Sequence, residues 1–214
     1  LDYLTRIFSP YQFNLFDINP LRSIIEEMVD FKALNKKCPI KLFINATHAQ
    51  TGASKIFDEE TVSLDAVMAS CCLPFIFKTV TVDKEPYWDG SLSGCPPLSP
   101  LIEGKYAQDI VLVQTHPTYV EDVPTTATDI LDRVTEISFN AVLTQELKNI
   151  AAYHKSVRVH RIEANETLIG LGRASKLNTE WNFLIHLHDL GVQAVTDWLG
   201  NLPTIVAGTG FKQA

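Results

Sequence analysis

The sequence is poor in the residues and runs that mark several classes of protein. It has 4 cysteines, none of them in a C-x-x-C pair, and only 10 Gly and 11 Pro among 214 residues. These counts exclude a zinc knuckle and a collagen-like or low-complexity chain. Charged residues make up 20% and hydrophobic residues 46%, which excludes intrinsic disorder. The sequence shows no run of about 18 apolar residues, the length that a membrane span requires.

Basic residues are also in short supply. Lys and Arg number 18 against 25 Asp and Glu, which gives a net charge of −7. Nucleic-acid-binding proteins concentrate basic residues, so we expect no nucleic-acid partner. Two of the cysteines are adjacent and could pair only with strain, so we interpret all four as thiols in a reducing compartment. We therefore expect a cytoplasmic protein. The cysteines are Cys38, Cys71, Cys72 and Cys95.

Helical and strand patterns alternate along the first half of the chain. Asn19-Pro20 predicts a helix start, because Asn is a good cap and Pro suits the first helical position; apolar residues then recur at helical spacing up to Val29. The order predicts an α/β layer architecture. The further elements predicted are a strand buried on both faces over Ile40–Ala46, a strand over Lys55–Phe57, a helix from Thr61 or Ser63 to Pro74, a hairpin of Thr79–Val82 and Tyr87–Trp88, a loop over Ser91–Pro100 and a buried strand over Asp109–Gln114.

The composition changes near Thr115, where a mainly helical region begins. We predict a long helix over Thr125–Asn149, a half-exposed strand over Val157–Ile162 and a closing helix over Glu180–Leu199. No repeat of 20 to 50 residues is visible, which excludes a solenoid.

Few residue patterns point to chemistry. Asp89-Gly90 follows a predicted strand, where a carboxylate can face a cleft and the glycine can adopt a positive φ, although Asp-Gly is also the commonest hairpin-turn dipeptide. The sequence has no G-x-S-x-G nucleophile motif, phosphate-binding loop, dinucleotide fingerprint or H-E-x-x-H, so we expect no cofactor and no metal.

The histidines are interpreted as structural or surface residues. His186 and His188 are two positions apart on a predicted helix and point to different faces, so they cannot bind one metal. His160 alternates with arginines and is predicted to be exposed. His48 and His116 follow predicted strands, where enzymes place functional groups, yet each is better read as a loop histidine.

Residues 69–100, ASCCLPFIFKTVTVDKEPYWDGSLSGCPPLSP, resemble the patatin-like phospholipases. The shared features are a small-residue helix end, Leu-Pro, a hairpin, and an aromatic strand that closes in Asp-Gly before a Pro-rich loop. The preceding KLFINAT and the following DIVLVQTHP fit the same family. DILDRVTEISFNAVLTQELKNI, VHRIE and SKLNTEWNFL resemble the C-terminal extension of a bacterial branch, so the resemblance covers nearly the whole chain.

The resemblance implies a three-layer α/β/α hydrolase sheet that is incomplete at its N-terminal side and carries a mainly helical C-terminal extension. Residues 1–114 would be the C-terminal part of the catalytic domain, and residues 115–214 would be the extension, packed on the same domain. The implied reaction is cleavage of lipid acyl esters by a Ser–Asp dyad. Asp89 would be the base and Gly90 the motif glycine, whereas Ser91 departs from the family's Gly or Ala.

In such a dyad the aspartate takes the proton of the serine hydroxyl directly, and backbone N–H groups hold the oxyanion. Asp89 must therefore be ionised. The family's nucleophile and oxyanion loop lie upstream of every motif seen here, so we expect this chain alone to be inactive. The partner implied is a lipid or acyl ester, with transient contact to a membrane surface, and the oligomeric state is open. Two alternatives remain, a non-catalytic lipid- or protein-binding module and an unrelated α/β domain.

Overall fold

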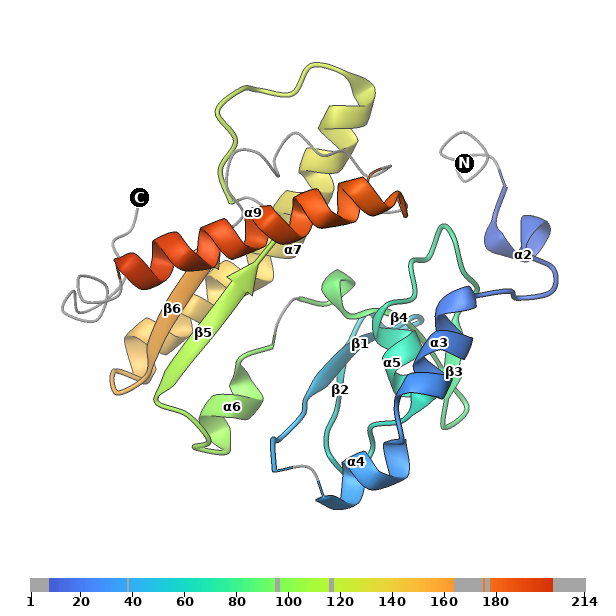
Figure 1. The fold of residues 1–214 in the computed structure, drawn as a ribbon, viewed down its shortest axis with the longest axis horizontal. Coiled ribbons are helices and arrows are strands. Elements are labelled where there is room, and N and C mark those ends of the chain that lie inside the picture. The colour runs from blue at the N-terminus through green and yellow to red at the C-terminus, as the bar shows by residue number, and fades with distance from the viewer. Residues whose placement is uncertain are drawn as a thin grey trace. The chain divides into compact units, whose positions relative to one another are not determined.

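The structure, a computed structural model, describes residues 8–37, 39–94, 97–115, 118–163, 175 and 178–201. The chain divides into two compact units, Leu1–Pro97 and Leu98–Ala214 (Figure 1). The fold is mixed α/β and the C-terminal part is mainly helical, which confirms the predicted fold class. The family-based boundary between residues 114 and 115 stays a prediction. No helix among the described residues is long and apolar enough to cross a membrane.

The first unit contains one antiparallel sheet of four strands, in the order β2-β1-β4-β3. Sequence patterns predicted all four strands, although β1 begins later than expected because its pairing with the short β2 starts only at Ile44. The helices α2 and α4 were not predicted. The elements are α2 (Pro10–Phe13), α3 (Pro20–Met28), α4 (Phe31–Lys37), β1 (Ile44–His48), β2 (Ser54–Phe57), α5 (Leu64–Ser70), β3 (Val80–Val82), β4 (Glu85–Asp89) and the 3-10 helix η1 (Gly90–Leu92).

Side-chain caps fix the two helices that sequence patterns did predict. The Asn19 side chain accepts a hydrogen bond from the N–H of Leu21, and Pro20 occupies the first position of α3, as expected. Ser63 caps α5 by accepting from the N–H of Ala66 at 3.2 Å. The core of this unit lies between α5 and the sheet and is formed by Ala46, Phe57, Val62, Ala66, Ala69, Val82 and Tyr87.

The hairpin between β3 and β4 turns at Asp83 and Lys84. Both residues are left-handed, with φ of 51° and 71°, as the tight two-residue turns that match the strand twist require. Asp89, in contrast, is the last residue of β4 and pairs with Ala46 of β1. The interpretation of Asp89-Gly90 as a hairpin turn is therefore wrong.

The second unit has a helix on each side of a two-stranded parallel sheet (Figure 1). On one face, Ile110 and Leu112 of β5 pack with Leu143 and Leu147 of α7. On the other face α9 contacts β6, and the His160 ring meets Trp198 edge-on. The elements are α6 (Ser99–Glu103), β5 (Asp109–Gln114), α7 (Ala127–Tyr153), β6 (Arg158–Glu163) and α9 (Trp181–Gly200).

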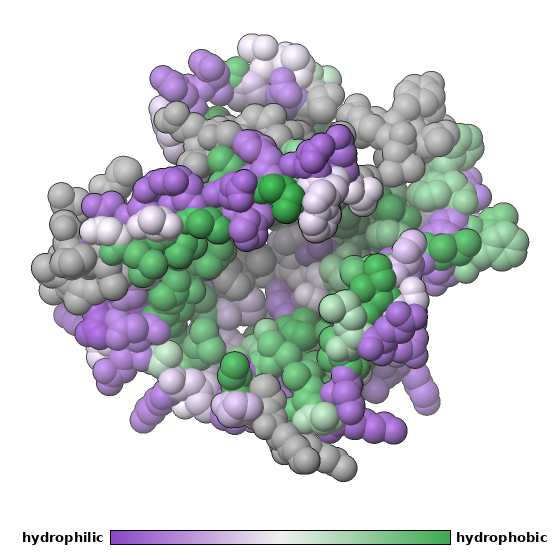
Figure 2. Space-filling model, viewed as in Figure 1, coloured by the Kyte–Doolittle hydropathy of each residue, from purple (hydrophilic) through white to green (hydrophobic). Residues whose placement is uncertain are grey.

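Strand β5 differs from its prediction as a buried strand. Its burial alternates, with Ile110 and Leu112 in the core while Val111 and Val113 are 52% and 65% exposed. The reason is that α7 packs on one face of β5, whereas α9, on the other face, contacts β6 and leaves Val111 and Val113 of β5 partly exposed. Figure 2 shows apolar side chains gathered below α9 in this region.

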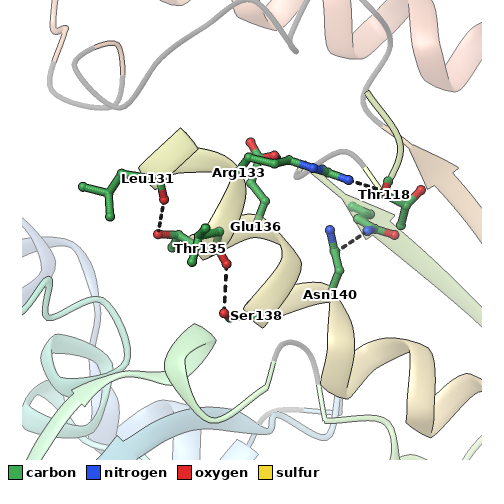
Figure 3. A network of polar contacts seen from close by, with 9 residues as sticks. Thr118, Leu131, Arg133, Thr135, Glu136, Ser138 and Asn140 are labelled. Atoms are coloured by element: carbon green, nitrogen blue, oxygen red, sulfur yellow. Dashed lines mark hydrogen bonds and ion pairs between the residues drawn. The ribbon is translucent and has the colours of Figure 1, made fainter. Parts of the chain in front are cut away.

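Polar contacts anchor the long helix α7. Thr126 caps its start by accepting from the N–H of Asp129 at 3.2 Å, and Arg133 donates to the carbonyl of Thr118 at 2.9 Å (Figure 3). Further along, Asn140 accepts from the side chain of Gln114, which is buried at the end of β5. These contacts connect α7 to the loop before it and to the carboxyl end of β5.

Candidate active site

Asp89 lies where β4 ends and the 3-10 helix η1 begins. Its backbone N–H donates to the carbonyl of Cys72, just after α5, at 2.9 Å. Since Asp89 pairs with Ala46, both side chains lie on the face of the sheet that α5 covers. The carboxylate is half-buried. The fold thus places this aspartate at the end of an inner strand of a helix-covered sheet.

The carboxylate of Asp89 caps its own loop. Its Oδ1 accepts from the backbone N–H of Ser91 at 2.8 Å. Ser91 is the position at which the sequence departs from the family pattern, but the contact uses only its backbone. A Gly or Ala at this position could donate the same hydrogen bond.

Gly90 is needed for space and not for its backbone angle. It is absent from the residues with positive φ, so the expectation of a positive φ is wrong. A Cβ atom built on Gly90 would lie 2.3 Å from the backbone oxygen of Asn45. The loop after Asp89 therefore crosses β1 so closely that no side chain fits.

Two polar side chains of β1 hold the same loop. Asn45 uses both protons of its Nδ2, donating to the carbonyls of Gly90 and Gly94 at 2.8 and 2.9 Å. The Thr47 hydroxyl donates to the carbonyl of Asp89 at 2.7 Å, and its oxygen accepts from the N–H of Ser93 at 3.0 Å. Neither residue could be identified from the sequence, because Asn and Thr in or beside an apolar run give no sign of what they face.

The two thiols next to this site, Cys71 and Cys72, have raised pKa values. Burial, followed by the negative charge of Asp89, raises the pKa of Cys71. Burial raises the pKa of Cys72 to about 12. Both are free thiols, as expected, whereas Cys38 and Cys95 lie outside the described residues. Since a thiol reacts as its thiolate, neither described cysteine is an activated nucleophile.

The histidines confirm the structural interpretation in part, although His48 is the last residue of β1 and not the loop histidine that was predicted. His48 pairs with Glu85 at 2.9 Å, and its Nδ1 accepts from the N–H groups of Gln50 and Thr51, which is a structural role. His188 is exposed on α9 beside Asp189. His116 lies outside the described residues. Among the residues that the structure describes, no cluster of His, Cys, Asp or Glu could hold a metal ion.

His160 was predicted to be exposed, and this prediction is wrong. It is only 8% exposed, because α9 covers this face of β6, and its Nε2 lies 2.9 Å from Oδ1 of Asp109. Arg158 contacts the same carboxylate with two nitrogens. The hydrogen bonds from Arg158 and then His160 lower the pKa of Asp109 to about 2. This cluster ties β5 to β6 at their amino ends.

The second unit also contains an open cavity of about 530 Å³. It lies between the carboxyl ends of β5 and β6 and the middle of α9. Its lining is largely apolar and includes Val113, Ile162, Leu190, Val192 and Val195. A cavity of this kind could accept an apolar ligand.

Comparison with known proteins gives one family. Residues 2–102 match the family model of the patatin-like phospholipases, a range that contains Asp89, Gly90 and the β1 side chains that hold their loop. No match was found among curated proteins. The first half of the chain is therefore similar to the patatin-like phospholipases, and this similarity supports a family of lipid acyl hydrolases.

Proposed function

We propose that this chain forms part of a serine esterase of the phospholipase A type, in which Asp89 is the base of a Ser–Asp dyad. The observation that carries the proposal is the position of Asp89, half-buried at a strand end with its backbone fixed at both its N–H and its carbonyl. The sequence contains no G-x-S-x-G. We therefore propose that the nucleophilic serine lies outside these 214 residues and that the chain alone does not turn over substrate.

In the proposed mechanism the ionised Asp89 accepts the proton of the serine hydroxyl as the serine oxygen attacks the carbonyl carbon of an acyl ester. The tetrahedral oxyanion collapses to an acyl-enzyme and expels the alcohol, which takes up the proton. Water, deprotonated by the same carboxylate, then attacks the acyl carbon; the bond to the serine oxygen breaks, that oxygen takes back the proton, and the fatty acid is released. The hydrogen bond from the N–H of Ser91 to Oδ1 leaves Oδ2 of Asp89 as the oxygen to meet the serine.

The test is Asp89→Asn in the full-length protein. Asn caps a helix start about as well as Asp, so the bond from Ser91 is kept while the charge is lost. Removing a general base costs about 10²–10⁴-fold in rate. We expect hydrolysis of a short-chain p-nitrophenyl ester and of a phospholipid to fall by that factor, and labelling by a fluorophosphonate probe to slow in parallel.

The matched control is Asp83→Asn. Asp83 lies in the hairpin turn of the same unit, in a left-handed conformation that Asn also tolerates. We expect this variant to keep wild-type turnover. Full turnover by Asp89→Asn would remove Asp89 from the mechanism.

A membrane surface and a cytoplasmic location also belong to the proposal. A lipid-hydrolysing enzyme must reach substrate within an aggregate, so we propose transient contact with a membrane surface. The adjacent free thiols Cys71 and Cys72 support a reducing compartment, and we propose the cytoplasm. Vesicle flotation and cell fractionation, respectively, would test these two points.

A second candidate function, a non-catalytic lipid-binding module, is favoured by the apolar cavity of about 530 Å³. A fluorescent fatty acid should then bind the 214-residue chain, and Val195→Asp, which places a charge in the cavity lining, should weaken that binding at least tenfold. Gln193→Glu, also on α9 but absent from the lining residues, adds the same charge and is the control. Equal binding by all three proteins would reject this candidate.

A further inference from the structure

We propose that Thr47 and Asn45 are positioning residues for Asp89, and that Thr47 sets the reactivity of its carboxylate. The inference rests on the proposed function, because it concerns the same aspartate. Neither residue is proposed to touch substrate. Both act through the backbone of the loop that carries Asp89.

The alternation of β1 explains why these two side chains reach the loop. Residues two apart on a strand share a face, so Asn45 and Thr47 lie together on the face opposite to Ala46. Ala46 is fully buried in the core and pairs with Asp89. The carboxylate and its support therefore lie on opposite faces of the sheet, and the support reaches Asp89 only through its carbonyl.

Thr47 is built into this arrangement with both its donor and its acceptor used. It is only 4% exposed, and its single proton goes to the carbonyl of Asp89 at 2.7 Å. Its oxygen accepts from the N–H of Ser93 and lies 2.9 Å from the Ser93 hydroxyl. One hydroxyl thus joins the two ends of the turn that follows the aspartate.

Asn45 holds the rest of the loop that follows Asp89. Its two donated hydrogen bonds hold the carbonyls of Gly90 and Gly94, and its Oδ1 accepts from Ser54 of β2 at 2.6 Å. The side chain is thereby fixed from the neighbouring strand and cannot follow the loop if the loop moves. The absence of a side chain on Gly90 lets the loop come within reach of these donors.

Reaction depends on this geometry because a base must lie within hydrogen-bond reach of the hydroxyl it deprotonates. A misplacement of about 1 Å can cost about 10²-fold in rate. The N–H of Asp89 is held by Cys72 and its carbonyl by Thr47, so removing the Thr47 hydroxyl releases one of two anchors. We expect the Asp89 carboxylate to move away from the serine hydroxyl, which slows proton transfer, while substrate binding is retained.

The test uses Thr47→Val, which keeps the shape of the side chain and removes the hydroxyl, in the full-length protein. We expect kcat for a p-nitrophenyl ester to fall about 10- to 100-fold, with KM changed by less than about twofold. Thr47→Ser restores the hydroxyl and should recover kcat to within about threefold of the wild type. The control is Thr81→Val, at an exposed position of β3, which should leave both constants unchanged.

A loss of kcat with constant KM supports positioning, because the bound substrate is then retained while the reaction slows. Rescue by Ser assigns the effect to the hydroxyl and not to the methyl group of Thr47. Wild-type kcat in Thr47→Val overturns the inference. If Thr47→Val does not fold, Ser93→Ala, which removes the hydroxyl beside Thr47 and leaves β1 unchanged, should lower kcat two- to tenfold, and an unchanged kcat overturns the inference. Failure of the proposed function is recognised separately, by full turnover in Asp89→Asn.

Discussion

Gly90 offers the most direct test of how this site is built, because the reason for a glycine there differs from the one the sequence indicates. In Gly90→Ala the new methyl group would lie 2.3 Å from the backbone oxygen of Asn45 and 2.7 Å from its carbonyl carbon. Ordinary contacts of a Cβ atom begin at about 3.4 Å. The loop or the strand must therefore move by about 1 Å.

Neither the loop after Asp89 nor strand β1 can move without losing hydrogen bonds. Asn45 belongs to β1, which pairs with β2 on one side and β4 on the other, and moving the loop breaks the hydrogen bonds from Asn45 to Gly90 and Gly94. Overpacking in a well-packed region costs about 1–3 kcal/mol. Because the two nearest atoms are backbone atoms of Asn45 and not the end of a flexible side chain, we expect the upper end of this range. With an m-value of about 2 kcal/mol per molar, the urea midpoint should fall by more than about 1 M.

The assay should report each unit separately, since the chain contains two. Pulsed hydrogen exchange with peptide mass spectrometry, carried out along a urea series, gives a midpoint for peptides from β1 and β4. Gly191→Ala is the control. A Cβ there meets nothing within 4 Å, and Gly191 lies inside α9, so this change should stabilise the second unit by about 0.5–1 kcal/mol.

The reasoning would be refuted by a Gly90→Ala protein whose β1 and β4 peptides keep the wild-type midpoint. That result would mean that the loop does not press against the Asn45 carbonyl. A lowered midpoint in both glycine variants would be equally damaging, because it would show a general cost of the Ala substitution and not a local clash.

Two further predictions concern charge. Asp89 helps to raise the pKa of Cys71, so Asp89→Asn should lower that pKa. The peptide containing Cys71 should then be modified faster by N-ethylmaleimide at pH 8. An unchanged rate would mean that the carboxylate does not act on the thiol. The pKa of Asp109 is lowered to about 2 from 3.8, so its ionised form stabilises the fold above pH 4, and this stabilisation is lost as the pH falls toward 2. In Asp109→Asn the urea midpoint of β5 and β6 should therefore lie below that of the wild type at pH 6, and this difference in midpoint should disappear as the pH falls to 2. A difference that persists at pH 2 would argue against the ion pair as its cause.

Local patterns predicted most of the regular structure because their signals are local as well. The Asn19-Pro20 helix start, the Ser63 cap and the turn at Asp83-Lys84 each depend on residues within a few positions of one another. The exposure of Val111 and the burial of His160 depend instead on which helices cover the sheet. No window of sequence contains that information, so both were predicted incorrectly.

In the candidate site, too, the residues with a local sequence signal were predicted and those brought in by strand pairing were not. Asp89 and Gly90 could be identified because an Asp-Gly dipeptide has a family precedent. The side chains that hold them could not, since Asn45 and Thr47 lie more than 40 residues away in sequence. Their role follows from the antiparallel register of β1 and β4, which only the structure gives.

The alternation along β1 ties the site to the stability of its unit. Ala46 contributes to the hydrophobic core, and the residues on either side of it hold the Asp89 loop on the opposite face. Because a shift of one residue would exchange the two faces, a slipped strand would bury two polar side chains and free the loop in the same step. A chain with this strand out of register cannot therefore keep a well-packed core while its Asp89 loop is displaced. Chaperones and proteases that recognise exposed apolar surface would then also remove molecules with a misplaced carboxylate.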